Sequence, residues 1–370
     1  MSEISSDRHI IFIIGTRAQL IKVAPIISKC EKSALPCTIL MTGQHKDTMD
    51  DLFNEFSIKT EKLYATIPIE RSTIFSLFAW LPKAYGGTVK QLKTMKDKYN
   101  NSDVLVLVHG DTLTTLISAY CGKRAGCKVI HIESGLTSGN YLSPFPEELI
   151  RNLVFKMTDI AFCPDDKSYR HMQKVSKATI FNTNGNTIFD AIDKVAQDNS
   201  FSSSKNRTPY VVVSIHRFNN IYHKARLVEL IKKIKQVAQF IPIKFVLHPA
   251  TLKRLNQYQL YEILEQEKNI ELLPRMSYFN FIRFAYAAEC VLTDGGSNQE
   301  ELAYLGIPTI VMRSHTERED GLGSNAIMES EVVDFSDFFS LRKYTNLREE
   351  DKKSSYSPSE MIISTLQNYK

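Results

Sequence analysis

The sequence predicts an α/β protein made of two halves, each a parallel sheet covered by helices on both faces. Short apolar runs typical of buried strands alternate with helical patterns along the chain. A serine-rich, polar stretch at residues 195–208 interrupts this series and is typical of a linker. The length of 370 residues favours about two domains. We expect domains at residues 1–195 and 208–335, C-terminal helices at 336–370, and a cleft between the two domains.

The composition and charge of the chain argue against nucleic-acid binding and against a metal site. With 43% hydrophobic and 24% charged residues the chain is typical of soluble globular proteins, and its net charge of +5 comes mostly from lysine-rich helices. Because no basic stripe is interleaved with aromatic residues, we do not expect nucleic-acid binding. The six cysteines form no CxxC pair and have no accompanying histidine spacing, which favours reduced thiols in a cytoplasmic protein and no metal site.

The N-terminal residues lack the pattern of a signal peptide, and no apolar run is long enough for a membrane span. The most apolar stretch, residues 74–81 (IFSLFAWL), is too short to cross a bilayer. We expect it to form a core or interface helix, with contact at a membrane surface as the alternative.

The first half contains five predicted strands followed by polar or glycine-rich turns, at residues 10–14, 38–41, 104–108, 129–133 and 160–163. Arg17 and Lys22 follow the first strand and lie near a predicted helix start, where doubly wound folds often bind phosphate. The alternative is that Arg17 only caps the helix or forms a salt bridge. The sequence has neither a GxGxxG nor a GxxxxGK[ST] motif, so no dinucleotide fingerprint or Walker loop is predicted.

Carboxylates follow the strands of this half. Asp111 stands at a strand-to-helix turn, as a helix N-cap or as a group facing the cleft, and Glu133 ends the next strand. Glu147 and Glu148 stand at a predicted helix start, a position that also favours acidic residues for structural reasons. Carboxylates crowded at one sheet edge can have their pKa values pushed apart, which suits acid and base roles.

The second half has strand signals at residues 211–213, 244–247, 290–292 and 309–312. The segment TDGGSNQEE (293–301) reads as a strand end, a glycine turn and a helix start, with Ser297 and Asn298 as candidate N-caps. Such a helix start suits a phosphate or another anion, although a plain tight turn has the same pattern.

Several segments, in this order and spacing, resemble the UDP-N-acetylglucosamine 2-epimerase family over most of residues 10–330. They are GTRAQLIKVAPII (15–27), TGQH (42–45), HGDT (109–112), HIESGL (131–136), PEELIR (146–151), NGNTIFDA (184–191), SIHR (214–217) and TDGGSNQEELAYLGIPTIVMRSHTER (293–318). The resemblance implies a GT-B fold, with two Rossmann-like domains and a nucleotide sugar in the interdomain cleft. It implies no metal and no redox cofactor.

The resemblance also assigns roles. It implies that Asp111, Glu133 and Glu147 move protons around C2 and C3 of the sugar, and that His216 lies near the diphosphate leaving group. The residues that it implies for substrate binding, with Arg17 on phosphate and Glu301 on the ribose, are Arg17, Lys22, Gly295, Gly296, Ser297, Glu301 and Arg313. Gln44 and His45 are candidate allosteric residues.

Three motifs depart from the family pattern. An arginine-proline-glutamate is replaced by Arg17-Ala18-Gln19, and a His-Arg-Arg-Glu-Asn run is replaced by residues 216–220, HRFNN. Gly295 stands where the family has a serine after Asp294. These changes concern the nucleotide contacts more than the carboxylates.

The resemblance favours a homodimeric 2-epimerase that interconverts UDP-N-acetylglucosamine and UDP-N-acetylmannosamine, or a related UDP-sugar, for surface polysaccharide synthesis. The alternatives are a hydrolysing epimerase that releases N-acetylmannosamine and UDP, a GT-B glycosyltransferase, and a non-catalytic nucleotide-sugar binder.

Overall fold

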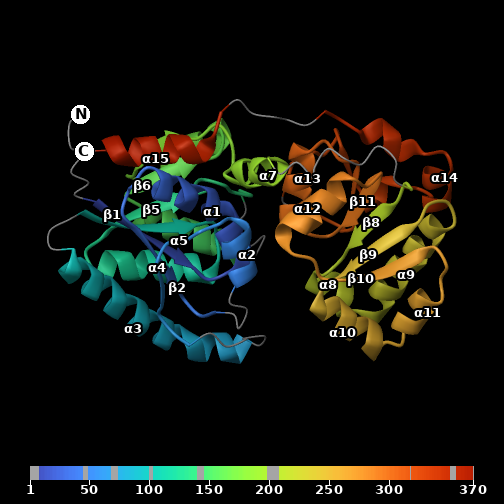
Figure 1. Ribbon diagram of the computed structural model, residues 1–370, viewed down its shortest axis with the longest axis horizontal. Coiled ribbons are helices and arrows are strands. Elements are labelled where there is room, and N and C mark those ends of the chain that lie inside the picture. The colour runs from blue at the N-terminus through green and yellow to red at the C-terminus, as the bar shows by residue number, and fades with distance from the viewer. Residues whose placement is uncertain are drawn as a thin grey trace. The chain divides into compact units, whose positions relative to one another are not determined.

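The computed structural model of the chain describes residues 8–44, 49–67, 74–99, 103–139, 146–197, 208–316, 318–350 and 356–369. The chain divides into two compact units (Figure 1). The first comprises Met1–Ala191 together with Ser355–Lys370, and the second comprises Ile192–Ser354. Each unit is built on its own parallel sheet, as the alternation of strand and helix patterns predicts.

The first unit alternates strands and helices and also receives the last helix of the chain. Its strands are β1 (Arg8–Ile14), β2 (Cys37–Met41), β3 (Lys62–Tyr64), β4 (Asp103–His109), β5 (Lys128–Ile132), β6 (Ile160–Cys163) and β7 (Thr179–Asn182). Its helices are α1 (Arg17–Lys32), α2 (Asp50–Glu55), α3 (Ile74–Lys98), α4 (Leu113–Arg124), α5 (Glu147–Met157), α6 (Asp166–Val175) and α15 (Pro358–Asn368), while α7 (Ile188–Ala196) spans the division between the units.

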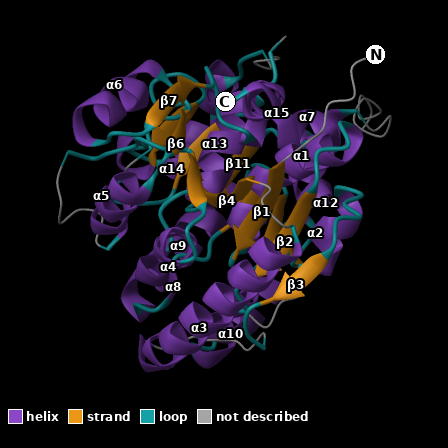
Figure 2. Ribbon diagram, turned by 90° about the vertical axis from the view of Figure 1, so that its left-hand side faces the viewer, coloured by secondary structure: helices purple, strands orange, loops and turns teal. Residues whose placement is uncertain are grey.

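The strand order of the first sheet creates a switch point between β1 and β4. Over the described residues the order is β3-β2-β1-β4-β5-β6-β7, and every pair is parallel (Figure 2). The chain therefore leaves β1 toward one side of the sheet and β4 toward the other. Ligands of open α/β sheets bind beyond the carboxyl ends of the strands at such a point, and it is there that Arg17 and Asp111 follow their strands.

Helix α15 completes the first unit by packing on α1 (Figure 1). Arg8 Nη1 donates to the carbonyl oxygen of Leu366 over 2.6 Å, and Lys29 Nζ lies 2.5 Å from Glu360 Oε2. The C-terminal segment, for which the sequence predicts helices, is thus shared: α14 lies in the second unit and α15 in the first.

The second unit has a six-stranded parallel sheet over the described residues, in the order β10-β9-β8-β11-β12-β13. Its strands are β8 (Val211–Ser214), β9 (Ile243–Leu247), β10 (Ile270–Pro274), β11 (Cys290–Thr293), β12 (Thr309–Val311) and β13 (Ala326–Met328). Its helices are α8 (Phe218–Ile221), α9 (Lys224–Ala238), α10 (Pro249–Gln257), α11 (Tyr261–Glu265), α12 (Tyr278–Tyr286), α13 (Gly296–Tyr304) and α14 (Phe335–Ser340), with 3-10 turns η2 (Glu329–Glu331) and η3 (Lys343–Leu347).

The predicted strands are confirmed in both units, and four further strands were not predicted. These are β3, β7, β10 and β13, the edge strands of the two sheets, in which most side chains are partly or fully exposed. The predicted strands are the central ones, where helices on both faces bury the side chains completely, as for Ile10–Ile14. The apolar runs in the sequence therefore identify the middle of each sheet and miss its margins.

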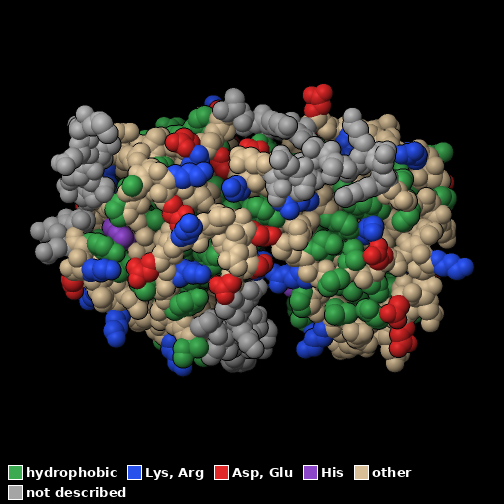
Figure 3. Space-filling model, in the orientation of Figure 1, with side chains coloured by type: hydrophobic (Ala, Val, Ile, Leu, Met, Phe, Trp, Pro, Cys, Tyr) green, Lys and Arg blue, Asp and Glu red, His purple; other side chains and the backbone are tan. Residues whose placement is uncertain are grey.

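Charged side chains of both signs are interspersed over the visible face of the first unit (Figure 3). This distribution matches the modest net charge of the chain.

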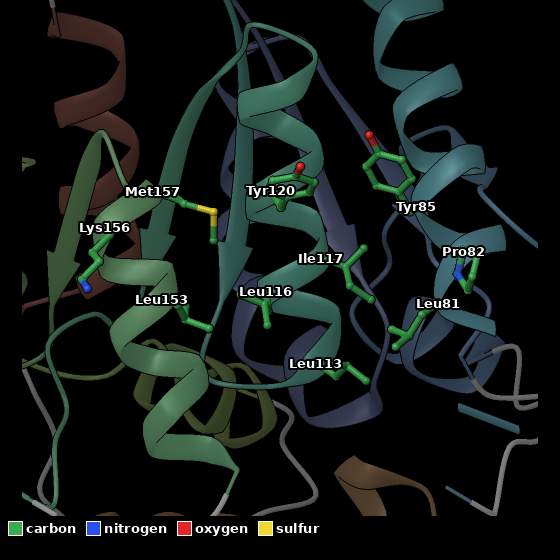
Figure 4. A pocket seen from close by; sticks show the side chains of 10 residues that line it. All are labelled: Leu81, Pro82, Tyr85, Leu113, Leu116, Ile117, Tyr120, Leu153, Lys156 and Met157. Carbon is green, nitrogen blue, oxygen red and sulfur yellow. The ribbon is translucent and has the colours of Figure 1, made fainter. Parts of the chain in front are cut away.

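Helix α3 contains the apolar stretch at residues 74–81. Within it, Trp80 is buried and its Nε1 donates to the carbonyl oxygen of Thr42 over 3.3 Å. The next turns of α3 line an apolar pocket of about 630 Å³ that α4 and α5 complete (Figure 4). Its lining residues are Leu81, Pro82, Tyr85, Leu113, Leu116, Ile117, Tyr120, Leu153, Lys156 and Met157. Within the described ranges, no helix combines the length and apolar character needed to cross a membrane.

Candidate active site

The carboxylates of the first unit meet at the carboxyl ends of two neighbouring strands. Asp111 follows β4 and Glu133 follows β5, and these strands pair in parallel. Gly110 N donates to the carbonyl oxygen of Ile132 over 3.1 Å. A Cβ at Gly110 would lie 3.7 Å from Glu133 Oε2, so the glutamate side chain lies against the turn that carries Asp111. The turn and the glutamate thus occupy one small region of the sheet edge.

The Glu133 carboxylate is buried and held from several elements. Its Oε1 accepts from Lys22 Nζ over 2.6 Å and from Asn186 Nδ2 over 2.7 Å. Its Oε2 lies 3.4 Å from His109 Nε2. The side chains of Glu133 and Lys22 are only 7% and 4% exposed, so this is a buried ion pair with additional hydrogen bonds, the condition under which such a pair is stable.

The backbone at Glu133 is also unusual, since it has a φ of +60° in the left-handed region. Residues with a Cβ adopt this region at a cost of about 1–3 kcal/mol, and such residues cluster at functional sites. The chain must turn sharply here because Gly135, at φ +88°, passes so close to α6 that a Cβ would lie 2.2 Å from the Ser168 carbonyl oxygen. The turn directs the Glu133 carboxylate back over the sheet edge.

Arg151 connects Asp111 to the first turn of α5. Its Nε and Nη2 donate to Asp111 Oδ2 over 2.8 and 2.5 Å, and its Nη1 donates to Glu148 Oε2 over 2.9 Å. Asp111 is not the N-cap of α4, because Thr112 caps that helix by accepting from Thr115 N. Of the two interpretations open from the sequence, the capping one is therefore wrong.

The two glutamates at the start of α5 have different surroundings. Glu148 is buried and accepts hydrogen bonds from Thr137 Oγ1 and Ser138 N as well as from Arg151. Burial raises the pKa of Glu148, but these hydrogen bonds outweigh burial and hold it below its ordinary value. Glu147 is half-buried, and its Oε2 has no hydrogen-bond partner among the described residues. Glu148 is thus a fixed anion, whereas Glu147 Oε2 is a buried carboxylate oxygen without a hydrogen-bond partner among the described residues.

Gln19, which replaces a glutamate of the family pattern, is buried between β1 and β4. Its Oε1 accepts from Gly15 N and Thr16 N over 3.0 and 3.2 Å. Its Nε2 donates to the carbonyl oxygen of His109 over 2.9 Å, a bond that a carboxylate cannot make. The amide therefore fits its local surroundings and joins the two strand ends that flank the switch point.

The remaining predicted residues of the first unit lie at its carboxyl edge with varied partners. Arg17 forms a bidentate ion pair with Asp51 of α2, with N–O distances of 2.6 and 2.5 Å. Gln44 Oε1 accepts from Thr114 Oγ1 over 2.6 Å. His45 lies outside the described residues.

In the second unit, His216 follows β8 and lies beside the buried carboxylate of Asp294, which follows β11. Asp294 accepts from His216 N and Arg217 N, each over 2.9 Å, and its Oδ1 lies 3.4 Å from His216 Nδ1. Burial lowers the pKa of His216, while the charge of Asp294 opposes that shift. The imidazole is therefore neutral at pH 7 and retains access to solvent, since 37% of its side chain is exposed.

The glycine turn places backbone and two guanidinium groups together. Helix α13 begins at Gly296 with Gly295 as its N-cap residue. A Cβ at Gly296 would lie 3.2 Å from Arg313 Nη2 and equally close to Arg318 Nε. Ser297 and Asn298 are not caps, so that prediction was wrong; instead Thr293 Oγ1 accepts from Gly295 N over 3.1 Å.

Gly295, which stands where the family has serine, faces the imidazole. A Cβ there would lie 3.2 Å from His216 Cε1 and from Asn298 Cγ, so the glycine permits close packing of His216. Further along α13, Glu301 is buried, and the neighbouring Glu300 pairs with Arg318 over 2.8 Å.

Phe218 stands where the family pattern has a second arginine, and its ring is 62% exposed. It stacks on Tyr222 with ring centroids 4.1 Å apart. The guanidinium of Arg254 lies 3.7 Å above the Tyr222 ring. A stacked aromatic pair with an arginine from α10 therefore occupies the region next to His216 in sequence.

Several residues of these clusters were not predicted individually: Arg151, Asn186, Asp294, Arg318 and also His248, whose ring centroid lies 5.4 Å from that of His216. The sequence contained a signal for all of these except His248, because Arg151, Asn186, Asp294 and Arg318 lie within segments that resemble the family. Among the described residues no group of histidine, cysteine and acidic side chains could hold a metal ion.

Comparison with known proteins identifies the family. The sequence profile of the UDP-N-acetylglucosamine 2-epimerase family matches residues 28–333. A UDP-N-acetylglucosamine 2-epimerase from Methanocaldococcus jannaschii is 30% identical over 333 residues, 85% of this chain and 87% of the relative. One from Campylobacter jejuni is 29% identical over 339 residues, 86% and 85% of the two chains.

Solved structures agree with this identification. The M. jannaschii UDP-GlcNAc 2-epimerase, in complex with UDP-GlcNAc and UDP, matches 97% of this chain and 99% of its own with a TM-score of 0.75 and 25% identity. The two parallel-sheet units confirm the predicted GT-B fold. The chain therefore belongs to the UDP-N-acetylglucosamine 2-epimerase family, a family of nucleotide-sugar epimerases.

Proposed function

We propose that this protein interconverts UDP-N-acetylglucosamine and UDP-N-acetylmannosamine and so supplies an activated sugar for surface polysaccharide synthesis. One observation carries the proposal: two carboxylates, Asp111 and Glu133, lie at neighbouring strand ends, each bonded to a cationic side chain, in the fold of this family. Inversion at C2 requires proton removal on one face of the sugar and proton delivery on the other, and such a set of carboxylates suits that task.

The reaction begins with removal of the C2 proton and departure of UDP from C1, which gives a glycal. Re-addition of UDP with protonation on the opposite face inverts C2. A C2–H that is not next to a carbonyl is a weak acid, so the base acts only if the leaving group is stabilised in the same step. Asp111, Glu133 and Glu147 would handle the proton. Glu147 is preferred over Glu148 because Arg151, Thr137 and Ser138 already bind the Glu148 carboxylate.

The second unit would stabilise the departing diphosphate. Helix α13 begins at Gly296, so its N-terminal backbone N–H groups would face the diphosphate, and the guanidinium groups of Arg313 and Arg318 lie against the same glycine. His216, neutral at pH 7 because burial lowers its pKa, would hydrogen-bond the leaving oxygen. Ser297, in the first turn of α13, and Glu301, one turn further on, would contact the phosphate and the ribose respectively.

Lys22 and Arg17 would act differently from each other. The buried ion pair of Lys22 with Glu133 supports a role for this lysine in holding the carboxylate in place, in contrast to direct phosphate binding. Arg17 is partly exposed and would exchange Asp51 for a phosphate oxygen of the substrate. Gln44 and His45 remain candidates for an allosteric role.

We also propose that the active form is a cytoplasmic homodimer. The apolar pocket formed by α3, α4 and α5 supports this proposal, because its lining residues Tyr120 on α4 and Leu153 on α5 are exposed and a second copy of the chain would cover them (Figure 4). All six cysteines are free thiols, which supports a reducing compartment.

Product analysis tests the proposed reaction. The purified protein is incubated with UDP-N-acetylglucosamine, and the sugar products are followed by ¹H NMR. Formation of UDP-N-acetylmannosamine with the UDP–sugar bond retained is expected. Free N-acetylmannosamine with UDP would indicate the hydrolysing reaction instead, transfer of the sugar to an added acceptor would indicate a glycosyltransferase, and unchanged UDP-N-acetylglucosamine would refute the proposal.

A further inference from the structure

A continuous series of polar contacts leads from the surface of α9 to the turn that carries His216. It contains five side chains, from η2, α9, α8, the β11–α13 turn and the β8–α8 turn: Glu329, Arg226, Asn220, Asp294 and His216. Apart from His216, none of them is assigned a role in the proposed reaction.

The inner end of the series is the Asp294 carboxylate, which is fully buried. It accepts from His216 N and Arg217 N and also from Asn220 Nδ2 over 2.9 Å. Three donors therefore fix its position, and one of them is the backbone of the histidine itself. Any movement of this carboxylate changes both the backbone and the charge next to the imidazole.

Asn220 has both ends of its amide engaged. Its Nδ2 donates to Asp294 and to the carbonyl oxygen of Met312, over 2.9 and 2.8 Å, while its Oδ1 accepts from Arg226 Nε over 3.2 Å. The two acceptors at Nδ2 and the donor at Oδ1 are all satisfied by the same orientation of the amide. Removal of the Arg226 contact would leave the carbonyl end of a buried amide without its donor, which weakens that orientation.

Arg226 is itself held by Glu329, whose side chain is only 6% exposed. Arg226 Nη1 lies 3.0 Å from Glu329 Oε1, and Nη2 bonds the other carboxylate oxygen. This bidentate arrangement fixes the plane of the guanidinium and hence the direction of Nε. Lys233 also pairs with Glu329 but does not contact Asn220, so it offers a matched control.

We propose that Arg226, clamped by Glu329, is a positioning residue that acts through Asn220 and Asp294 to hold His216 in its working orientation. This inference rests on the proposed function, in which His216 bonds the leaving oxygen. Arg226 would contact neither the substrate nor the reacting atoms, and its effect on the reaction would be transmitted through Asn220 and the turn that carries Asp294.

The expected effect on His216 follows from its charged surroundings. The charged groups that act on it are Asp294, Arg217, Arg313 and Arg275, and the ring of His248, whose own pKa is lowered to about 4, lies 5.4 Å away. Burial and the three arginines lower its pKa, and Asp294 raises it. A carboxylate that is less firmly held moves away from Nδ1 on average, so the pKa of His216 should fall further when Arg226 is removed.

The test compares Arg226→Met with Lys233→Met in protein labelled with ¹³C at histidine Cε1. The His216 resonance is assigned by its loss in His216→Gln, and its titration is followed by NMR. We expect its pKa to fall by about half a unit or more in Arg226→Met and to stay unchanged in Lys233→Met. In kinetics with UDP-N-acetylglucosamine, Arg226→Met should lower kcat by about tenfold to a hundredfold with KM within about twofold.

Equal His216 titration curves in the two variants would overturn the inference. If circular dichroism shows that Arg226→Met is unfolded, Arg226→Lys replaces it, since a lysine keeps the charge beside Glu329 but lacks the planar donor toward Asn220. Failure of the proposed function can be distinguished from failure of this inference. Absence of turnover in the unmodified protein would refute the proposed function, while the NMR titration would still show whether Arg226 positions His216.

Discussion

Lys22 Nζ and Glu133 Oε1 lie 2.6 Å apart in the interior of the first unit, with both side chains almost fully buried. The glutamate has a left-handed backbone and an additional hydrogen bond from Asn186. An ion pair in this setting stabilises the fold only while both partners are present, because an isolated buried charge loses its solvation without compensation.

Replacement of Lys22 by methionine should destabilise the protein by about 3–5 kcal/mol, since it leaves the Glu133 charge unpaired. The double variant Lys22→Met/Glu133→Gln should recover part of that loss, because the uncompensated charge is gone. Urea unfolding of both variants and of Glu133→Gln measures the coupling. If the losses of the two single variants simply add, the ion pair contributes nothing to the fold.

Substitution of the two glutamates at the start of α5 should have different effects, one on activity and the other on stability. Glu147→Gln should lower turnover by about tenfold to a thousandfold, the usual range for a lost acid–base group, with little change in stability. Glu148→Gln should cost about 1–3 kcal/mol of stability, because it disturbs the bonds from Arg151 and Thr137. Steady-state kinetics and urea unfolding distinguish them, and the reverse pattern would exchange their roles.

Gly15, at the end of β1, should tolerate no side chain. A Cβ there would lie 2.1 Å from Thr114 Oγ1, so Gly15→Ala should destabilise the protein by about 1–3 kcal/mol or more. Gly86 is the matched control, because it lies in helix α3 with no atom within 4 Å of an added Cβ. Gly86→Ala should stabilise the protein by about 0.5–1 kcal/mol. Thermal unfolding checks both, and similar shifts for the two would contradict the packing at β1.

Stability should decrease in mild acid. Burial lowers the pKa of His131 to about 4 from its ordinary 6.5, so the unfolded chain binds a proton in this interval that the folded chain does not. The free energy of unfolding is therefore fully retained above pH 6.5, falls between pH 6.5 and about 4, and loses nothing further from this group below that.

His9 and His248, also lowered to about 4 by burial, add to the same slope. His131→Gln keeps an amide donor for the Gly110 carbonyl oxygen, to which His131 Nε2 donates over 2.9 Å. Urea unfolding between pH 4 and 7 should show a slope smaller by about one proton in this variant. An unchanged slope would mean that His131 is not neutral in the folded protein.

The sequence was sufficient to predict the central strands and the polar residues that follow them. Asp111 and Glu133 were predicted at one sheet edge because apolar runs identify the buried parallel strands and the carboxyl ends of such strands share an edge, whereas the role of His216 was predicted from the family resemblance. The edge strands β7 and β10 were not predicted because most of their side chains are partly or fully exposed, so their sequences lack the continuous apolar run of a central strand.

The partners of these residues could not be predicted. Arg151 is 40 residues from Asp111, Asn186 is 53 from Glu133, and Arg226 is 103 from Glu329. Only tertiary packing brings such pairs together. The prediction of a cap at Ser297 was wrong for a related reason. The hydroxyl that accepts a hydrogen bond from the turn, at Gly295 N, belongs to Thr293 at the end of the preceding strand.

The central claim is that the carboxylates of the first unit exchange the C2 proton of the sugar. It is tested most directly by incubating UDP-N-acetylglucosamine with the protein in deuterated water and measuring deuterium at C2 by NMR. We expect incorporation with the unmodified protein and with Glu360→Gln, an exposed carboxylate of the same unit. We expect incorporation at least about tenfold slower with Glu133→Gln and with Asp111→Asn. Deuterium entering C2 at the unmodified rate in both of these variants would contradict the claim.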